Sequence, residues 1–275
     1  MKIWEALIYG LVAGLTGLLP VSFSGHAAVL QDAFALSPLT QGGGLYVRAA
    51  ITLGLSAALV LAFPGELQLT CGELARRPQR GKRARQPSPR RRAVLMGLLA
   101  LPIGLLSLIW CAAAERITRL SLIAAFFCLN GLILFAAGRP GGQKDARALK
   151  LPDALLAGAT RLAAVLPGLS PLGLTLAVCR LRDLRTDFAL RFTAMLTLGF
   201  SLCEFVYRLL RAVIVGTFSA SLWLPMLVAL VASTVAGYFA LQYLKYLLHR
   251  EKLRVFSYYC WDAAVIALIL ALINA

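Results

Sequence analysis

Long apolar stretches without any charge constrain this chain more than any other feature of its sequence. Four of them are Ile51–Phe63, Ala93–Ala114, Leu120–Gly138 and Ala263–Ala275. A helix needs about 20 mostly apolar residues to cross a bilayer, and lipid offers no partner to unpaired backbone groups. The sequence therefore predicts an all-α polytopic membrane protein that forms a single membrane domain over residues 1–275.

About six stretches are expected to cross the membrane fully. They are Leu45–Phe63, Ala93–Ala114, Leu120–Gly138, Phe188–Ala212, Leu222–Leu248 and Val255–Ile273. Glu204 and Arg208 stand four residues apart in the fourth of these, and we interpret them as an interfacial ion pair near the outer surface. The first apolar stretch begins at Ile3 without a basic segment before it or a cleavage site before Pro20, so we expect it to remain in the protein.

Two further apolar stretches do not fit a single span. Ile3–Leu36 is too long for one crossing and is broken at Pro20, and Pro152–Arg180 is broken at "LPGLSPLG". Proline interrupts a helix because it lacks an N–H and collides with the preceding turn. Each stretch is therefore predicted to form a re-entrant helical hairpin, which is tolerated where protein or a watery cavity satisfies the broken backbone.

Basic residues give the expected orientation. The chain has 28 Lys and Arg against 12 acidic residues, a net charge of +16, and nine basic residues gather in Arg76–Arg92. Cytoplasmic loops of membrane proteins carry such an excess. We expect loop 64–92 to be cytoplasmic and to contact anionic phospholipid headgroups. Nucleic acid is not an expected partner, because no aromatic residues alternate with these charges. Threading the spans places the two hairpins on opposite faces of the membrane.

The two hairpins resemble each other. "ALIYGLVAGLTGLLPVSFSG" begins at Ala6 and "ALLAGATRLAAVLPGLSPLG" begins at Ala154, and both contain Leu-Pro, a hydroxyl residue and Gly. We therefore expect an inverted repeat, with a first repeat over about 1–138 and a second over about 150–275. Such architectures place their site at the repeat interface near the bilayer midplane.

The hairpin breaks supply the candidate site residues: Ser22, Ser24, Gly25, His26, Gly168, Ser170, Gly173 and Thr175. Hydroxyls, free N–H groups at helix starts and an imidazole suit an anionic headgroup. Small and hydroxyl residues also mediate contacts between membrane helices, and for Ser24 and Thr175 alone we favour that interpretation. For His26 the two interpretations are evenly balanced, since ionisable groups at the midplane are costly and usually functional.

"EALIYGLVAGLTGLLPVSFSGHAAVL" and "LPGLSPLGLT" resemble the two signatures of the undecaprenyl-pyrophosphate phosphatases of the bacitracin-resistance type. The resemblance implies an inverted-repeat fold and a role in peptidoglycan and cell-wall synthesis. It also implies metal-assisted hydrolysis of undecaprenyl pyrophosphate to the monophosphate outside the membrane. The matching catalytic residues are His26, Ser22 and Ser170, with Ser24, Gly25, Gly168, Gly173 and Thr175 around the substrate. The implied partners are a polyprenyl pyrophosphate and the lipid of the bacterial plasma membrane.

The chain departs from the family pattern at the charged positions. Ala13 and Gly17 stand where the family has glutamates, and Pro171 stands where it has an arginine. A divalent cation such as Mg²⁺ or Ca²⁺ prefers oxygen ligands, so the sequence shows no metal site and no evident cofactor. Arg161 either restores a positive charge to the substrate site or extends to the cytoplasmic interface, and we favour the second.

Three functions therefore stay open at the level of sequence. The chain is an active phosphatase with an altered site, a non-catalytic polyprenyl-phosphate binder or translocase, or a structural membrane partner without a ligand. Whether it forms a homo-oligomer is also open. The missing carboxylates and arginine predict a metal-dependent activity that is absent or far below that of relatives with intact motifs.

Overall fold

The computed structural model describes residues 1–65, 72, 88–140, 142–215 and 218–274. Apart from one isolated β-bridge between Lys144 and Leu184, the regular elements in these ranges are helices. They are α1 (Ile3–Gly17), α2 (Phe23–Phe34), α3 (Gly44–Ala62), α5 (Pro89–Leu105), α6 (Ser107–Ala114), α7 (Leu120–Ala137), α8 (Leu151–Ala164), α9 (Pro171–Leu181), α10 (Thr186–Val215), η1 (Ala220–Leu222), α11 (Trp223–His249) and α12 (Val255–Ile273). The prediction of an all-α membrane fold is confirmed.

The membrane-spanning helices agree with the expected set, with two qualifications. Four stretches are long and apolar enough to cross: α3, α7, α11 together with η1, and α12. The pair α5 and α6 adds a fifth span that bends by 42°, and Pro102 near the end of α5 accounts for the bend. The sixth, α10, has the length to cross with its 30 residues but carries charges along its course.

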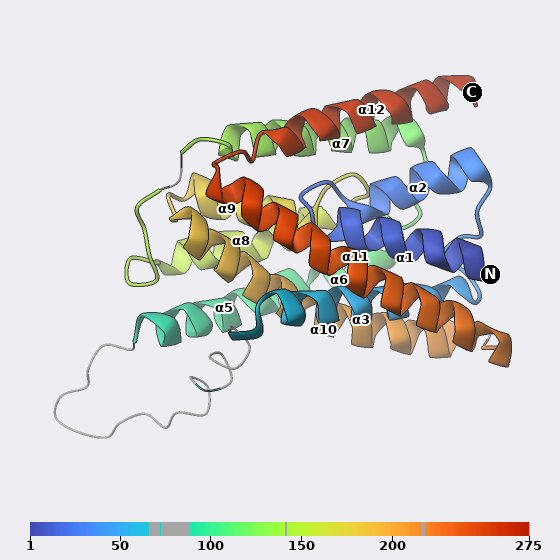
Figure 1. Ribbon diagram of the computed structural model, residues 1–275, viewed down its shortest axis with the longest axis horizontal. Coiled ribbons are helices and arrows are strands. Elements are labelled where there is room, and N and C mark those ends of the chain that lie inside the picture. Colours follow the sequence, from blue (N-terminus) through green and yellow to red (C-terminus); the bar gives the residue numbers. More distant parts are fainter. Residues whose placement is uncertain (66–71, 73–87, 141, 216–217, 275) are drawn as a thin grey trace.

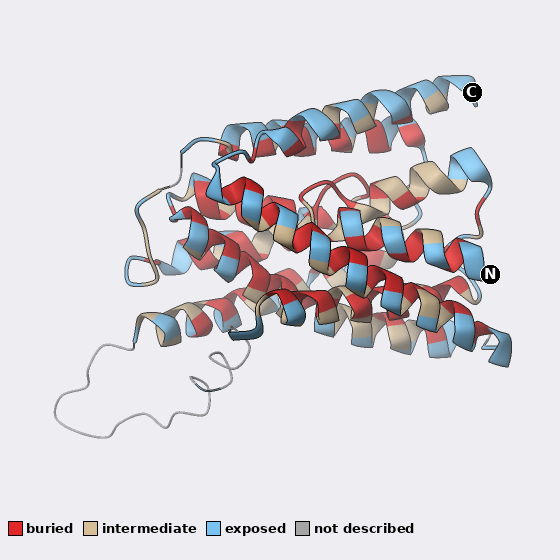
Figure 2. Cartoon of the chain, viewed as in Figure 1, coloured by how far each residue is buried: buried red, intermediate tan, exposed pale blue. Residues whose placement is uncertain are grey.

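Both re-entrant hairpins are present, and they enter from opposite faces. In Figure 1 the start of α1 and the end of α2 lie at one end of the molecule, whereas α8 starts and α9 ends at the other. The two tips meet between these ends, where Figure 2 shows buried loops in red. This is the arrangement that the basic loops and the interrupted helices predict.

Local sequence explains why each hairpin turns where it does. The first hairpin leaves α1 after Gly17, and its Ser22 has a φ of +69° before α2 begins. The second turns at Gly168, whose φ of +106° lies in the region that favours glycine. Pro171 then occupies the first position of α9, where a missing N–H costs nothing.

The two hairpins begin and pack in the same way. Lys2 and Lys150 are the N-caps of α1 and α8, and their N–H groups donate to Glu5 at 2.7 Å and to Asp153 at 3.2 Å. Helix α1 then packs along α11, just as α8 packs along α5. These parallels support a repeat, while its boundaries at about 1–138 and 150–275 remain a prediction.

The basic segments lie together at one end of the molecule. The connections from α7 to α8, α9 to α10 and α11 to α12 all lie at the end from which α8 and α9 enter (Figure 1). The excess of Lys and Arg predicts that this end is the cytoplasmic side, which would place the termini outside. Most of loop 64–92, for which we expect phospholipid contacts, lies outside the described residues.

Candidate functional site

The tips of the two hairpins are joined by hydroxyl groups that also cap helices. The Ser22 Oγ accepts a hydrogen bond from the N–H of Gly168 at 3.1 Å and one from the N–H of Gly25 at 3.5 Å. The Ser170 Oγ accepts from the N–H of Gly173 at 3.1 Å and donates to the backbone of the first tip. Five of the expected residues therefore lie together at the tips, with both serines fully buried.

Close backbone packing and one buried amide complete this junction. A Cβ on Gly25 would lie 2.9 Å from the Cα of Gly168, so only glycine fits there. Asn130 on α7 donates to the carbonyl of Pro20 at 3.0 Å and accepts from the N–H of Ser170 at 3.0 Å. Since buried polar groups need partners, Asn130 holds the two tips in register.

A cavity of about 110 Å³ lies beside the tips. Hairpin residues that line it include Gly17, Ser24 and Pro171, which belong to the two signatures. Its charged lining residues are Arg48 on α3, Glu115 after α6, Arg161 on α8, and Glu204 and Arg208 on α10. Arg48 stands near the start of α3 and Glu115 directly follows α6, so the cavity lies on the outer side of the tips.

The charged residues of the cavity form one ionic network. Arg208 donates to Glu115 at 2.7 Å and to Glu204 at 2.6 Å. Glu204 also accepts from Arg161 at 2.5 Å, and Glu115 from Arg48 at 3.2 Å and from Arg211. Burial raises the pKa of Glu115, but the guanidinium groups of Arg48 and Arg208 outweigh it and lower the pKa to about 2. Glu115 is therefore ionised at neutral pH.

Two preferences from the sequence need correction here. Arg161 does not extend to the cytoplasmic interface: it is 9% exposed, pairs with Glu204 and lines the cavity. The expected ion pair between Glu204 and Arg208 does form, but it belongs to the buried network rather than to a surface pair. In both cases a partner distant in sequence satisfies the charge inside the protein, which makes extension to the interface unnecessary.

His26 lies on the other side of the first tip from the cavity. Its Nδ1 is 2.6 Å from the carbonyl oxygen of Ser22 and its Nε2 is 2.9 Å from the hydroxyl of Tyr259 on α12. Its ring also lies beside an apolar groove of about 670 Å³ between the first hairpin, α11 and α12. Both partners of the imidazole therefore lie outside the second hairpin, although the sequence groups His26 with Ser170 in one candidate site.

Thr175 contacts a neighbouring helix and does not line the cavity. Its Oγ1 donates to the carbonyl of Pro171 at 2.9 Å and lies 2.9 Å from the hydroxyl of Thr160 on α8. It is 2% exposed. These contacts agree with the interpretation that we favoured for Thr175, a hydroxyl between membrane helices.

The donor groups of the cavity do not fit a divalent cation. Among the described residues, no group of three or more His, Cys, Asp or Glu side chains is placed to hold a metal ion. The two carboxylates that line the cavity, Glu115 and Glu204, are both engaged by guanidinium groups. Ala13, where the family has a glutamate, is fully buried in an apolar cluster and does not face the cavity.

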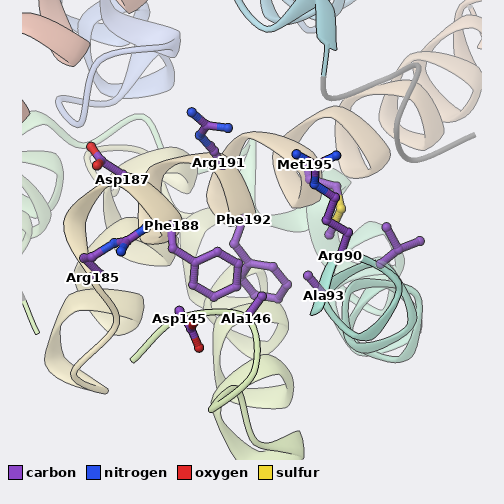
Figure 3. Close-up of a pocket in the computed structure, with 11 residues that line it drawn as sticks. Arg90, Ala93, Asp145, Ala146, Arg185, Asp187, Phe188, Arg191, Phe192 and Met195 are labelled. Carbon is purple, nitrogen blue, oxygen red and sulfur yellow. The ribbon is translucent and has the colours of Figure 1, made fainter. Parts of the chain in front are cut away.

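A larger pocket of about 340 Å³ lies among residues of α5, α10 and the segments before α8 and α10 (Figure 3). Arg90, Arg185 and Arg191 surround it, with Asp145 and Asp187 among its lining residues. None of the residues expected in the site lines this pocket. Its basic lining fits the side of the membrane that the charge pattern assigns to it.

Sequence reasoning missed three residues of the site: Arg48, Glu115 and Asn130. Arg48 carried a usable signal, because an arginine inside an expected span marks a functional position by default. Asn130 carried a weaker one, a single amide in an otherwise apolar span. Glu115 falls between two expected spans, and nothing in the sequence indicates that it contacts α3 and α10.

Comparison with known proteins agrees with the architecture and the two signatures. The family model described as bacitracin resistance protein BacA matches residues 6–266. An undecaprenyl-diphosphatase from Methanobrevibacter smithii is 30% identical over 97% of this chain and 96% of its own length. Enzymes of the same name from Carboxydothermus hydrogenoformans and Rubrobacter xylanophilus are 31% and 30% identical over 98% and 99% of this chain, and over 98% and 100% of their own lengths. The chain belongs to the bacitracin resistance protein BacA family.

Proposed function

We propose that this multi-pass plasma-membrane protein hydrolyses undecaprenyl pyrophosphate to undecaprenyl monophosphate, which recycles the lipid carrier of cell-wall synthesis. The observation that carries the proposal is the arginine-lined cavity beside the hairpin tips, in a chain that matches undecaprenyl-diphosphatases over nearly its whole length. The reaction adds one water across the P–O–P bridge, releases inorganic phosphate and leaves one phosphate on the lipid.

The cavity suits the charged part of such a lipid, and a separate groove is apolar. Guanidinium groups bind phosphate oxygens in bidentate fashion and stabilise the charge that develops during phosphoryl transfer. The groove along α1, α11 and α12 is lined mainly by apolar residues such as Val12, Leu15 and Ile266. The groove and the cavity share no lining residue, so we assign the pyrophosphate to the cavity and no part of the same prenyl chain to the groove.

The hairpin residues divide between positioning and contact in this proposal. Ser22 and Ser170 are fully buried and hold the tips together, so we assign them to positioning. Ser24 lines the cavity, so we assign it to substrate contact in place of the helix contact that the sequence alone favours. His26 lies beside the groove with Tyr259, and its role as acid or base remains a prediction from the family resemblance.

A second function is favoured by two residues of the cavity wall. Gly17 and Pro171 line the cavity at positions where the family resemblance implies a glutamate and an arginine, so groups that would assist hydrolysis are missing there. In this second function, the protein binds or translocates a polyprenyl phosphate without cleaving it.

Phosphate release separates the two functions. Purified protein in detergent is given undecaprenyl pyrophosphate, once with EDTA and once with Mg²⁺, and inorganic phosphate is measured. Release that exceeds that of the Arg48→Gln/Arg161→Gln double variant supports hydrolysis. Binding of the lipid without release under either condition supports the binder or translocase.

A further inference from the structure

The cavity beside the tips contains more positive than negative charge. Three arginines line it against two glutamates. Each glutamate is already paired, because Arg208 bridges Glu115 and Glu204. An unbalanced guanidinium charge away from bulk water is costly unless an anion offsets it.

The three arginines differ in how many donors remain for a ligand. Arg208 donates from Nη1 to Glu115 and from both Nε and Nη2 to Glu204. Arg48 and Arg161 each contact a carboxylate through Nη2 alone among the described residues. Since a guanidinium has five N–H donors, these two keep most of their donors for an oxyanion.

The remaining surroundings favour an anion over a cation. Ser24, Thr197 and Ser201 contribute hydroxyls to the lining, and both lining carboxylates are occupied. The volume of about 110 Å³ suits a phosphate group and several waters rather than a whole lipid. Arg161 also reaches the same cavity that Pro171 lines, so it supplies positive charge from α8 where the second signature has lost its own.

We propose that Arg48 and Arg161 bind the phosphate oxygens of the ligand directly and replace the divalent cation that the family resemblance implies. The inference rests on the proposed function for the identity of the lipid, but the anion site itself is independent of hydrolysis. Arg208 is a positioning residue that neutralises the two glutamates, so that they do not repel the phosphate.

Binding without metal tests this inference. Purified protein in detergent and EDTA is titrated with farnesyl pyrophosphate and, separately, with inorganic pyrophosphate, and Kd is measured by calorimetry. The variants are Arg48→Gln and Arg161→Gln, and the matched control is Arg116→Gln, an exposed arginine of the outer linker. Both cavity variants leave the glutamates paired, because Glu115 keeps Arg208 and Arg211 and Glu204 keeps Arg208; thermal unfolding verifies their folding.

We expect wild-type protein to bind farnesyl pyrophosphate in EDTA. Each cavity variant should raise Kd about tenfold or more, as expected for a lost charge-assisted hydrogen bond, whereas Arg116→Gln leaves it unchanged. Binding that needs added Mg²⁺ or Ca²⁺ would overturn the proposal, and so would cavity variants that bind like the control. Arginine-dependent binding of inorganic pyrophosphate alone would uphold the anion site and overturn the lipid assignment. If neither ligand binds with or without metal, both proposals fail.

Discussion

At the scale of single residues, serines of the two signatures stabilise the fold. Ser22 and Ser170 use their hydroxyls to cap helices and to join the tips, whereas Ser24, two residues from Ser22, lines the cavity. The same hydroxyl chemistry thus serves two purposes within one turn. The difference is set by the fully buried position of Ser22.

Replacing Ser22 with alanine tests its structural role. Ser22→Ala removes the acceptor for the N–H of Gly168 and the cap of α2, and we expect a loss of about 1–2 kcal/mol in the free energy of unfolding. Thermal unfolding in detergent measures it. The control is Ser24→Ala, whose hydroxyl faces the cavity and should cost much less. Equal losses in both variants would contradict the assignment.

Glu115 is expected to make the free energy of unfolding depend on pH. Its folded-state pKa is lowered from 4.5 to about 2 by Arg48 and Arg208, with Arg211 and the thiol of Cys111 also facing it. A lowered carboxyl pKa contributes stability above the unfolded value near 4.5, and this stability is lost as pH falls toward 2. We therefore expect the melting temperature to drop as the pH falls from about 5 to about 3. In Glu115→Gln this part of the drop should be absent, and an unchanged profile would refute the interpretation.

At the scale of elements, the repeat is visible in how each hairpin starts. Lys2 and Lys150 are exposed N-caps, and the N–H of each donates a hydrogen bond to the carboxylate of the acidic residue three positions later. Glycines farther along both helices allow close contacts with neighbouring helices. For Gly14 an added Cβ would lie 2.6 Å from the Cβ of Ala236, and for Gly158 one would lie 2.4 Å from the carbonyl oxygen of Ala100. An inverted repeat requires two helices such as α1 and α8 that begin in the same way but on opposite faces of the membrane.

The two N-caps also provide a topology test. In a variant that lacks the six native cysteines, Lys2→Cys should react with a membrane-impermeant thiol reagent added outside intact cells. Lys150→Cys should react only after the cells are opened, because α8 enters from the side of the basic loops (Figure 1). Labelling of both positions from the same side would rule out the inverted arrangement.

At the scale of the whole molecule, ligands should stabilise the fold according to their charge. A ligand at 100 times its Kd raises the free energy of unfolding by about 2.7 kcal/mol. We expect pyrophosphate in EDTA to raise the melting temperature, since it neutralises the arginine cavity, and Mg²⁺ or Ca²⁺ alone to leave it unchanged. Sodium chloride at the same ionic strength controls for salt effects. A rise with Mg²⁺ alone would point to a metal site.

The sequence predicted the helices, both hairpins and the meeting of their tips, because uncharged runs, prolines and basic loops are local features with strong physical consequences in a membrane. The cavity was harder to predict, since its charges come from segments far apart in the chain. Arg161 was given the wrong environment because its partner, Glu204, lies 43 residues away. Tyr259 lies 233 residues from His26 and gave no signal of that contact.

The sealed tips decide where the membrane voltage falls. If external ions reach the cavity, they carry the external potential down to the junction of Ser22 and Gly168, and most of the drop then lies across the tips and the opposite half. A charge that crosses the whole membrane does work of about 2.3 kcal/mol per 100 mV. A headgroup that enters the cavity crosses little of this field, so its loading is nearly independent of the energised state of the cell. Carrying the same anion inward past the tips would instead require work against the negative interior.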